Sequence, residues 1–167
     1  MMMTEHAPPA IGTQYPLLFS YRDTLFGNGF LVEVQATNGR ALCVREPDEY
    51  WVYGINPGGM AAHGATPDAA HAAFRKTFSH LLVDLVLGSD NFEAFQAAVQ
   101  TFFEDTNHGY EAEWQQAIIA VRRGEVSLEG IPLVPANSPR KIVVSMKQVE
   151  QVTPQDNSAN VQYLLAA

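Results

Sequence analysis

The sequence predicts an α+β domain in which a mainly antiparallel sheet is covered by one long helix, with an additional helical insertion. Three observations lead to this prediction. Strand-like runs bounded by turn residues fill the chain from 15 to 63, a helical repeat of apolar residues follows at 67–87, and one more strand pattern comes late, at 141–149. Because 47% of the 167 residues are hydrophobic, the chain has enough apolar mass for one core.

Short strand patterns come first in the chain. In the second of them every other residue is apolar, and Glu33 and Gln35 lie between, so one face of this strand is expected to meet water. Gly27-Asn28-Gly29 separates it from the first strand, and Thr37-Asn38-Gly39-Arg40 predicts a tight hairpin after it, because Asn-Gly suits a type I′ turn. The strands are expected at residues 15–21, 30–36, 41–44, 50–55 and 60–63.

The main helix is predicted from Pro67 to about Leu87. Thr66 can cap its first turn, proline suits the first helical position, and Asp68 complements the positive end of the helix dipole. One apolar stripe at helical spacing is expected to cover the sheet. This stripe consists of Ala70, Phe74, Phe78, Leu81, Leu82 and Leu85.

Outside these strands and the main helix, the composition indicates a leader, a helical insertion and a tail. The first residues are rich in proline and lack periodicity, as is typical of a disordered leader. Two amphipathic segments, Phe92–Glu104 and Tyr110–Arg123, predict the helical insertion, and the polar end of the chain closes with a short apolar run at Val161–Leu165 that could dock as a strand. The expected organisation is a leader at 1–14, one domain at 15–149 with an insertion at about 90–124, and a tail at 150–167.

The charge balance argues against nucleic acid as a direct partner. The formal net charge is −8, and the ten lysines and arginines are scattered rather than gathered in a stripe. Such a field repels phosphates, so direct binding of nucleic acid is doubtful. Cys43 is the only cysteine, which excludes an internal disulfide and favours a buried thiol in a reducing compartment. With no signal-peptide pattern and no apolar run of ~20 residues, a cytoplasmic protein outside the membrane is expected.

No pattern in the sequence predicts a catalytic, metal or cofactor site. Only Glu33 offers a carboxylate on a predicted sheet strand, and a metal-dependent hydrolase needs several. The histidines are not four residues apart on one helix face, as paired metal ligands would be. Trp51 and Tyr53 share one face of their strand, where they could pack in the core or form an exposed docking patch. His63 precedes the main helix and could line a small pocket there.

The run Tyr50–Ala70 resembles the signature of the HicB-like antitoxins. That signature has a Tyr-Trp-Val strand, a turn glycine, four residues, a second glycine, a threonine and a helix that opens with an acid and an alanine. Here Gly59 and Gly64 are the two glycines, and Thr66 and Asp68 stand at the helix start. The opening strand and the link Ile131–Pro135 are similar to the family as well. The chain departs from the pattern at two positions: Gly58 stands where proline is usual, and Ala69 replaces an acid.

The resemblance implies a partial ribonuclease-H-like fold without catalytic activity. It implies a protein that binds and blocks a small basic toxin, and the acidic charge suits such a partner. Trp51, Tyr53 and His63 are the candidate partner-binding residues. The family's DNA-binding segment has no counterpart, because only residues 150–167 follow the last predicted strand and they carry no basic helix. The alternatives are a stand-alone structural or regulatory domain that forms homo-oligomers and has no toxin partner, and a hydrolase with an unrecognised acidic site, which nuclease activity abolished by Glu33→Ala would favour.

Overall fold

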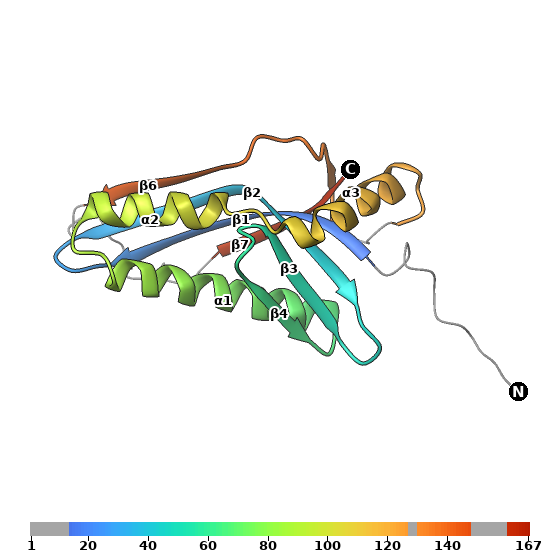
Figure 1. Ribbon diagram of the computed structural model, residues 1–167, viewed down its shortest axis with the longest axis horizontal. Helices are drawn as coiled ribbons and strands as arrows, with labels where there is room; N and C mark the ends of the chain where they lie inside the picture. The colour runs from blue at the N-terminus through green and yellow to red at the C-terminus, as the bar shows by residue number, and fades with distance from the viewer. Residues whose placement is uncertain (1–13, 127–129, 148–159) are drawn as a thin grey trace, which may run out of the picture.

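The computed structural model describes residues 14–126, 130–147 and 160–167. Within them the fold is α+β: a mostly antiparallel sheet of seven strands and three helices (Figure 1). The leader predicted at 1–14 lies outside the described residues except for its last residue, and so does the first part of the predicted tail. The elements are β1 (Gln14–Phe26), β2 (Leu31–Arg45), β3 (Tyr50–Asn56), β4 (Ala61–Gly64), α1 (Pro67–Leu87), α2 (Phe92–Glu104), α3 (His108–Arg122), β5 (Leu133–Val134), β6 (Lys141–Lys147) and β7 (Asn160–Ala166).

The long antiparallel pair β1 and β2 forms the centre of the sheet. The strand order is β4-β3-β2-β1-β7-β5, and β6 pairs with β2 as well. Residues 31–37 of β2 pair with β6, and residues 40–45 pair with β3. The same edge of β2 therefore pairs first with β6 and then, further along the strand, with β3. The pairing of β5 with β7 is parallel, and the other pairings are antiparallel.

The hairpin predicted at residues 37–40 is wrong. These residues lie inside β2, where the register with β1 shifts between Phe19 and Tyr21. Asn38 has a φ of 57°, which asparagine tolerates better than most residues, and it bends the strand instead of reversing it. A side chain at Gly39 would meet the ring of Phe19 at 2.5 Å. The Asn-Gly pair thus marks a bulge inside β2. The turn that joins β1 to β2 lies at Gly27–Phe30, where Gly29 has a φ of 84°.

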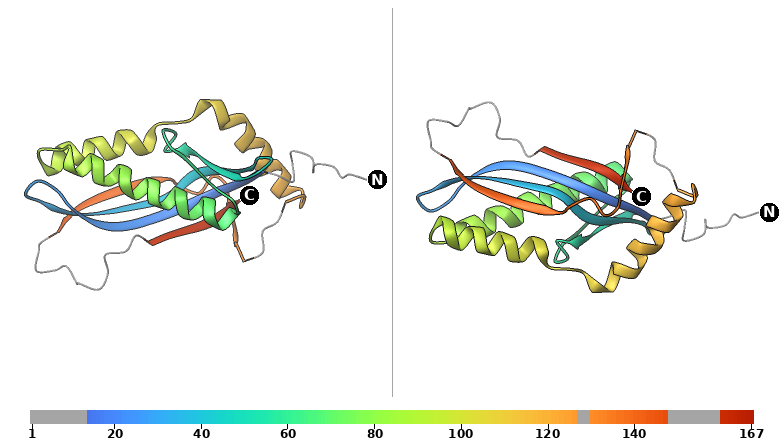
Figure 2. Two further views of the ribbon diagram at one scale, coloured as in Figure 1. Left: turned by 90° about the horizontal axis from the view of Figure 1, so that it is seen from below. Right: turned by 90° about the horizontal axis from the view of Figure 1, so that it is seen from above.

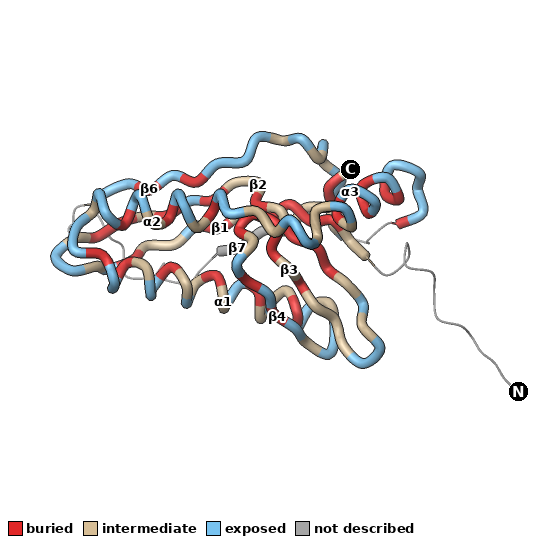
Figure 3. The backbone as a smooth tube through the Cα atoms, in the orientation of Figure 1, coloured by how far each residue is buried: buried red, intermediate tan, exposed pale blue. Residues whose placement is uncertain are grey.

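The two faces of the sheet are covered by different helices. On one face α1 and α2 lie together (Figure 2), and the apolar stripe of α1 packs on β1. There Phe19 makes edge-to-face contacts with Phe74 and Phe78 at centroid distances of 5.3 and 5.5 Å. On the other face Trp114 and Ile118 of α3 pack on the strands in a smaller cluster. The prediction of one covering helix therefore describes only part of the arrangement, and Figure 3 shows the buried positions of α1 and α2 on one side of each helix.

The predicted start of α1 is confirmed. The Thr66 hydroxyl accepts a hydrogen bond from the Ala69 amide at 3.0 Å, Pro67 is the first helical residue, and Asp68 lies in the first turn. Gly64 ends β4 in close contact with this turn, since a Cβ at Gly64 would come within 2.6 Å of the backbone of Ala69 and Ala70. A Cβ at Gly59, by contrast, would have its nearest neighbour, a carboxylate oxygen of Asp105, at 3.8 Å, which is an ordinary van der Waals distance.

The late strands complete the sheet. The strand predicted at 141–149 forms β6 over Lys141–Lys147, and the apolar run at Val161–Leu165 lies in β7, which pairs with β1. Residues 160–166 therefore belong to the sheet rather than to a separate tail. No helix in the described part of the chain is long and apolar enough to cross a membrane.

Candidate functional site

Four aromatic rings form a continuous row on the sheet face opposite α1. Trp51 and Tyr53 alternate with Val52, which is buried on the α1 side, so their rings lie on the other face of β3. The ring of Trp51 contacts His63 of β4 at 4.6 Å and stacks on Tyr53 at 5.7 Å, and Tyr53 stacks on Tyr110 of α3 at 4.2 Å. We call His63, Trp51, Tyr53 and Tyr110 the aromatic ladder. It is partly exposed, with the His63 side chain 55% accessible.

Two carboxylates from the β2–β3 turn border the ladder. Glu49 accepts a hydrogen bond from the Trp51 indole at 2.8 Å and lies 3.0 Å from the His63 imidazole. Glu46 accepts a longer bond, of 3.5 Å, from the Tyr53 hydroxyl. Burial, followed by the neighbouring Tyr110 and Glu46, raises the pKa of Tyr53, so its phenol stays neutral at ordinary pH. The site is thus an aromatic surface with an acidic rim.

The structure brings the predicted residues Trp51, Tyr53 and His63 together. The sequence suggested that His63 could line a small pocket beside the main helix. In the structure its ring lies against Trp51 on the partly exposed surface. Tyr110 was missed, because it comes from the predicted insertion and no sequence pattern links it to β3. The one available signal for a role of Tyr110 was an aromatic residue at the start of a predicted helix, directly after the break at residues 106–109. The predicted insertion therefore contributes directly to the candidate site.

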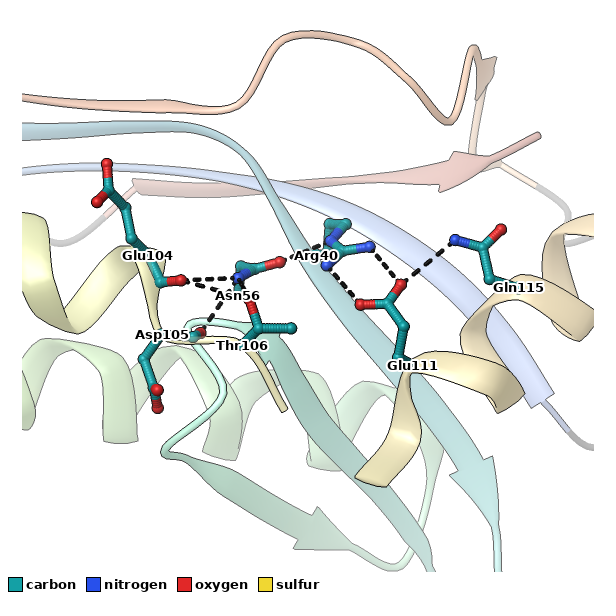
Figure 4. Close-up of polar contacts among 7 residues, drawn as sticks. All are labelled: Arg40, Asn56, Glu104, Asp105, Thr106, Glu111 and Gln115. Carbon is teal, nitrogen blue, oxygen red and sulfur yellow. Dashed lines mark hydrogen bonds and ion pairs between the residues drawn. The ribbon is translucent and has the colours of Figure 1, made fainter. Parts of the chain in front are cut away.

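A polar cluster next to the ladder holds α3 in place (Figure 4). The Arg40 guanidinium of β2 donates two hydrogen bonds to the Glu111 carboxylate, at 2.8 and 2.9 Å. It also lies over the Trp114 ring, 4.8 Å from the centroid, and donates from Nε to Asn56 at 2.7 Å. The Arg40 hydrogen bonds lower the pKa of Glu111. Since Glu111 directly follows Tyr110, this ion pair fixes the end of the ladder.

Asn56 connects the same cluster to the linker between α2 and α3. It has no exposed surface, and its amide nitrogen donates to the carbonyls of Glu104 and Asp105 and to the Thr106 hydroxyl at 2.7 to 3.2 Å (Figure 4). The Asn107 amide in turn donates to the Ile55 carbonyl at 2.9 Å. The Asn56 side chain and the Ile55 carbonyl therefore both hold the linker at the end of β3, and this attachment sets where α3 begins.

The residues considered for catalysis do not converge. Glu33 is occupied by ion pairs with Arg22 at 2.9 Å and with Lys147 at 3.8 Å. Cys43 is fully buried as predicted, and burial raises the pKa of its thiol to about 12. Among the described residues, no group of three or more His, Cys, Asp or Glu side chains could hold a metal ion.

Comparison of the chain with protein-family models, with curated proteins and with solved structures finds no match.

Proposed function

We propose that this protein is a non-enzymatic, HicB-like antitoxin-type protein that binds a small basic protein through the aromatic ladder. The observation that carries the proposal is the ladder itself, a row of four rings. Glu49 accepts a hydrogen bond from Trp51 in this row, and Glu46 accepts one from Tyr53. Aromatic rings with a polar edge are the side chains that most often dominate protein–protein binding energy.

The chemistry of the ladder favours a cationic partner. Ring faces attract lysine and arginine, and the carboxylates at the rim pair with the same cations. The net charge of −8 would also speed the encounter with a basic protein at low salt. A HicB-like protein that blocks a small basic toxin would need these properties, and the resemblance at Tyr50–Ala70 includes the strand that carries Trp51 and Tyr53.

The proposal is tested by capture of the partner from the native host, followed by binding measurements with the purified proteins. Wild type is expected to bring down a small basic protein in stoichiometric amount. The double variant Trp51→Ala, Tyr53→Ala should then bind this protein at least about ten-fold more weakly, because these rings are the centre of the surface. Phe26→Ala is the matched control, since Phe26 is an aromatic residue at the far end of the sheet with 62% of its surface exposed.

Two results would contradict the proposal. One is the absence of any basic protein in the captured material, and the other is equal binding by wild type and the double variant. The alternative of a self-associating domain is checked in the same preparation by light scattering coupled to size-exclusion chromatography. An oligomer of wild type that becomes a monomer in the double variant would assign the ladder to self-association instead.

A further inference from the structure

A cavity of about 440 Å³ lies between α3, the bend of β2 and the segment 136–140. Three arginines are among the residues that line it, Arg40, Arg122 and Arg140, and no Asp or Glu is among them. Three apolar residues also line the cavity, although each has only 1–2% of its surface exposed: Leu18, Trp114 and Ile118. Three of the ten basic residues of an acidic chain thus surround one cavity.

The positive charge in this cavity is only partly compensated. Arg40 is paired with Glu111, but Arg122 and Arg140 make no ion pair within the described part of the chain. Burial and the nearby Arg40 lower the pKa of Arg140, and Glu111 and Glu104 act in the opposite direction. Since a guanidinium group stays protonated in proteins, its charge persists and an anion in the cavity would be stabilised by it.

The cavity wall is held in shape before any ligand arrives. The Asn38 side chain donates to the Pro139 carbonyl at 2.7 Å, which ties the segment 136–140 to the bend of β2. The Ala136 amide donates to the Ala167 carbonyl at 2.6 Å, which ties the same segment to the end of β7. A pre-formed wall lowers the entropic cost of binding. The volume lies in the range typical of small-molecule sites.

We propose that this cavity binds a small organic anion. Arg122 and Arg140 hold its oxyanion group, which is a phosphoryl or a carboxyl group, and its body occupies the rest of the cavity. Asn137, also in the wall, adds an amide that can donate to the oxyanion. Elsewhere the acidic surface disfavours such ligands, so this cavity selects them locally. The site is separate from the aromatic ladder and does not depend on the protein-binding proposal.

The test uses simple probes and the intact protein in isothermal titration calorimetry at low salt. Benzoate and phenyl phosphate carry the two oxyanion groups on the same ring, and benzamide is the neutral match of benzoate. We expect at least one of the anions to bind and benzamide to bind far more weakly. The tighter of the two anions identifies the oxyanion group. The absence of binding by both anions up to ~10 mM would overturn the proposal.

Variants then locate the site. Arg140→Gln and Arg122→Gln are each expected to weaken anion binding at least about ten-fold, as the loss of a charge-assisted hydrogen bond does. Arg123→Gln is the matched control, because this arginine follows Arg122 directly but does not line the cavity. Thermal unfolding checks that each variant is folded. Equal anion binding by wild type and both cavity variants would place the site elsewhere and overturn the assignment.

Trp114 gives an independent readout in a Trp51→Phe background, since the chain has only two tryptophans. Its ring belongs to the cavity wall, so anion binding should change its fluorescence. The change should follow the same saturation curve as the calorimetric titration. A calorimetric signal without any change at Trp114 would contradict binding in this cavity.

Discussion

At the scale of single residues, Asn56 is the most consequential polar side chain. It is fully buried and makes hydrogen bonds to Arg40, Thr106 and two backbone carbonyls. We expect Asn56→Ala to lower the free energy of unfolding by about 3 kcal/mol, because several buried groups lose their partners at once. Urea unfolding at neutral pH, followed by tryptophan fluorescence, measures the change.

Gln115→Ala is the control for this experiment. Gln115 is exposed at the edge of the same cluster and donates one hydrogen bond of 3.3 Å to Glu111. Its loss should change the free energy of unfolding by less than about 0.5 kcal/mol. A similar small effect for Asn56→Ala would show that the linker between α2 and α3 is held by other contacts.

The sequence predicted single residues well where the neighbours were close along the chain. The spacing of Trp51 and Tyr53 placed both rings on one strand face, because side chains alternate along a strand. It gave no signal for the contact of Tyr53 with Tyr110, or for Asn56 as a buried connector, because both depend on segments that are distant in sequence. Nor did the sequence indicate the cavity, whose three arginines come from β2, α3 and the segment before β6.

At the scale of elements, the two glycines of the Tyr50–Ala70 run differ in what they do. Gly64→Ala would place a Cβ 2.6 Å from the backbone at the start of α1, so this turn must shift. We expect a loss of roughly 2 kcal/mol in the free energy of unfolding, as for other overpacked sites. Gly59→Ala has room for its methyl group, with the nearest atom at 3.8 Å, and should be nearly neutral. Parallel urea titrations of the two variants compare them, and equal losses would contradict this distinction.

The helices were predicted more closely than the strands. Caps and apolar stripes are local signals, so Thr66, Phe74 and Phe78 were enough to place α1. The pair Asn38-Gly39 is also a local signal, but it is shared by a hairpin turn and a strand bulge. Which of the two forms depends on pairing with β1, which continues past the bend on both sides. Long-range pairing therefore overrode the local preference.

At the scale of the whole molecule, His71 makes stability depend on pH. It lies at the contact of α1 with β7, where its ring stacks on Tyr163 at 4.7 Å and its buried Nε2 has no hydrogen-bond partner. Burial lowers its pKa below 6.5, and the negative charge of Asp68 on the same helix opposes this only in part. The unfolded chain therefore takes up this proton more readily than the folded protein. The neutral form's contribution to stability is complete above pH 6.5 and is lost as pH falls from there toward the folded pKa.

The variant His71→Leu tests this dependence. Between pH 7 and 5 its free energy of unfolding should fall less steeply than that of wild type, by at most ~1.4 kcal/mol per pH unit for one proton. Ala72→Leu, at an exposed position next to His71 on the same helix, introduces the same side chain without removing a histidine and should keep the wild-type slope. Guanidinium unfolding at a series of pH values measures the slopes, and parallel curves for wild type and His71→Leu would rule out His71 as the cause.

The place of β7 beside β1 has a consequence for the newly made chain. During synthesis β1 can pair with β2 as soon as residue 45 has left the ribosome, but among the described residues its other edge is covered only by β7, residues 160–166. Until then a central strand presents unpaired amides and carbonyls, and such edges readily join strands of other chains. The interval between these two moments is therefore the period of greatest risk of aggregation, and anything that covers the bare edge of β1 during it would raise the yield of folded protein.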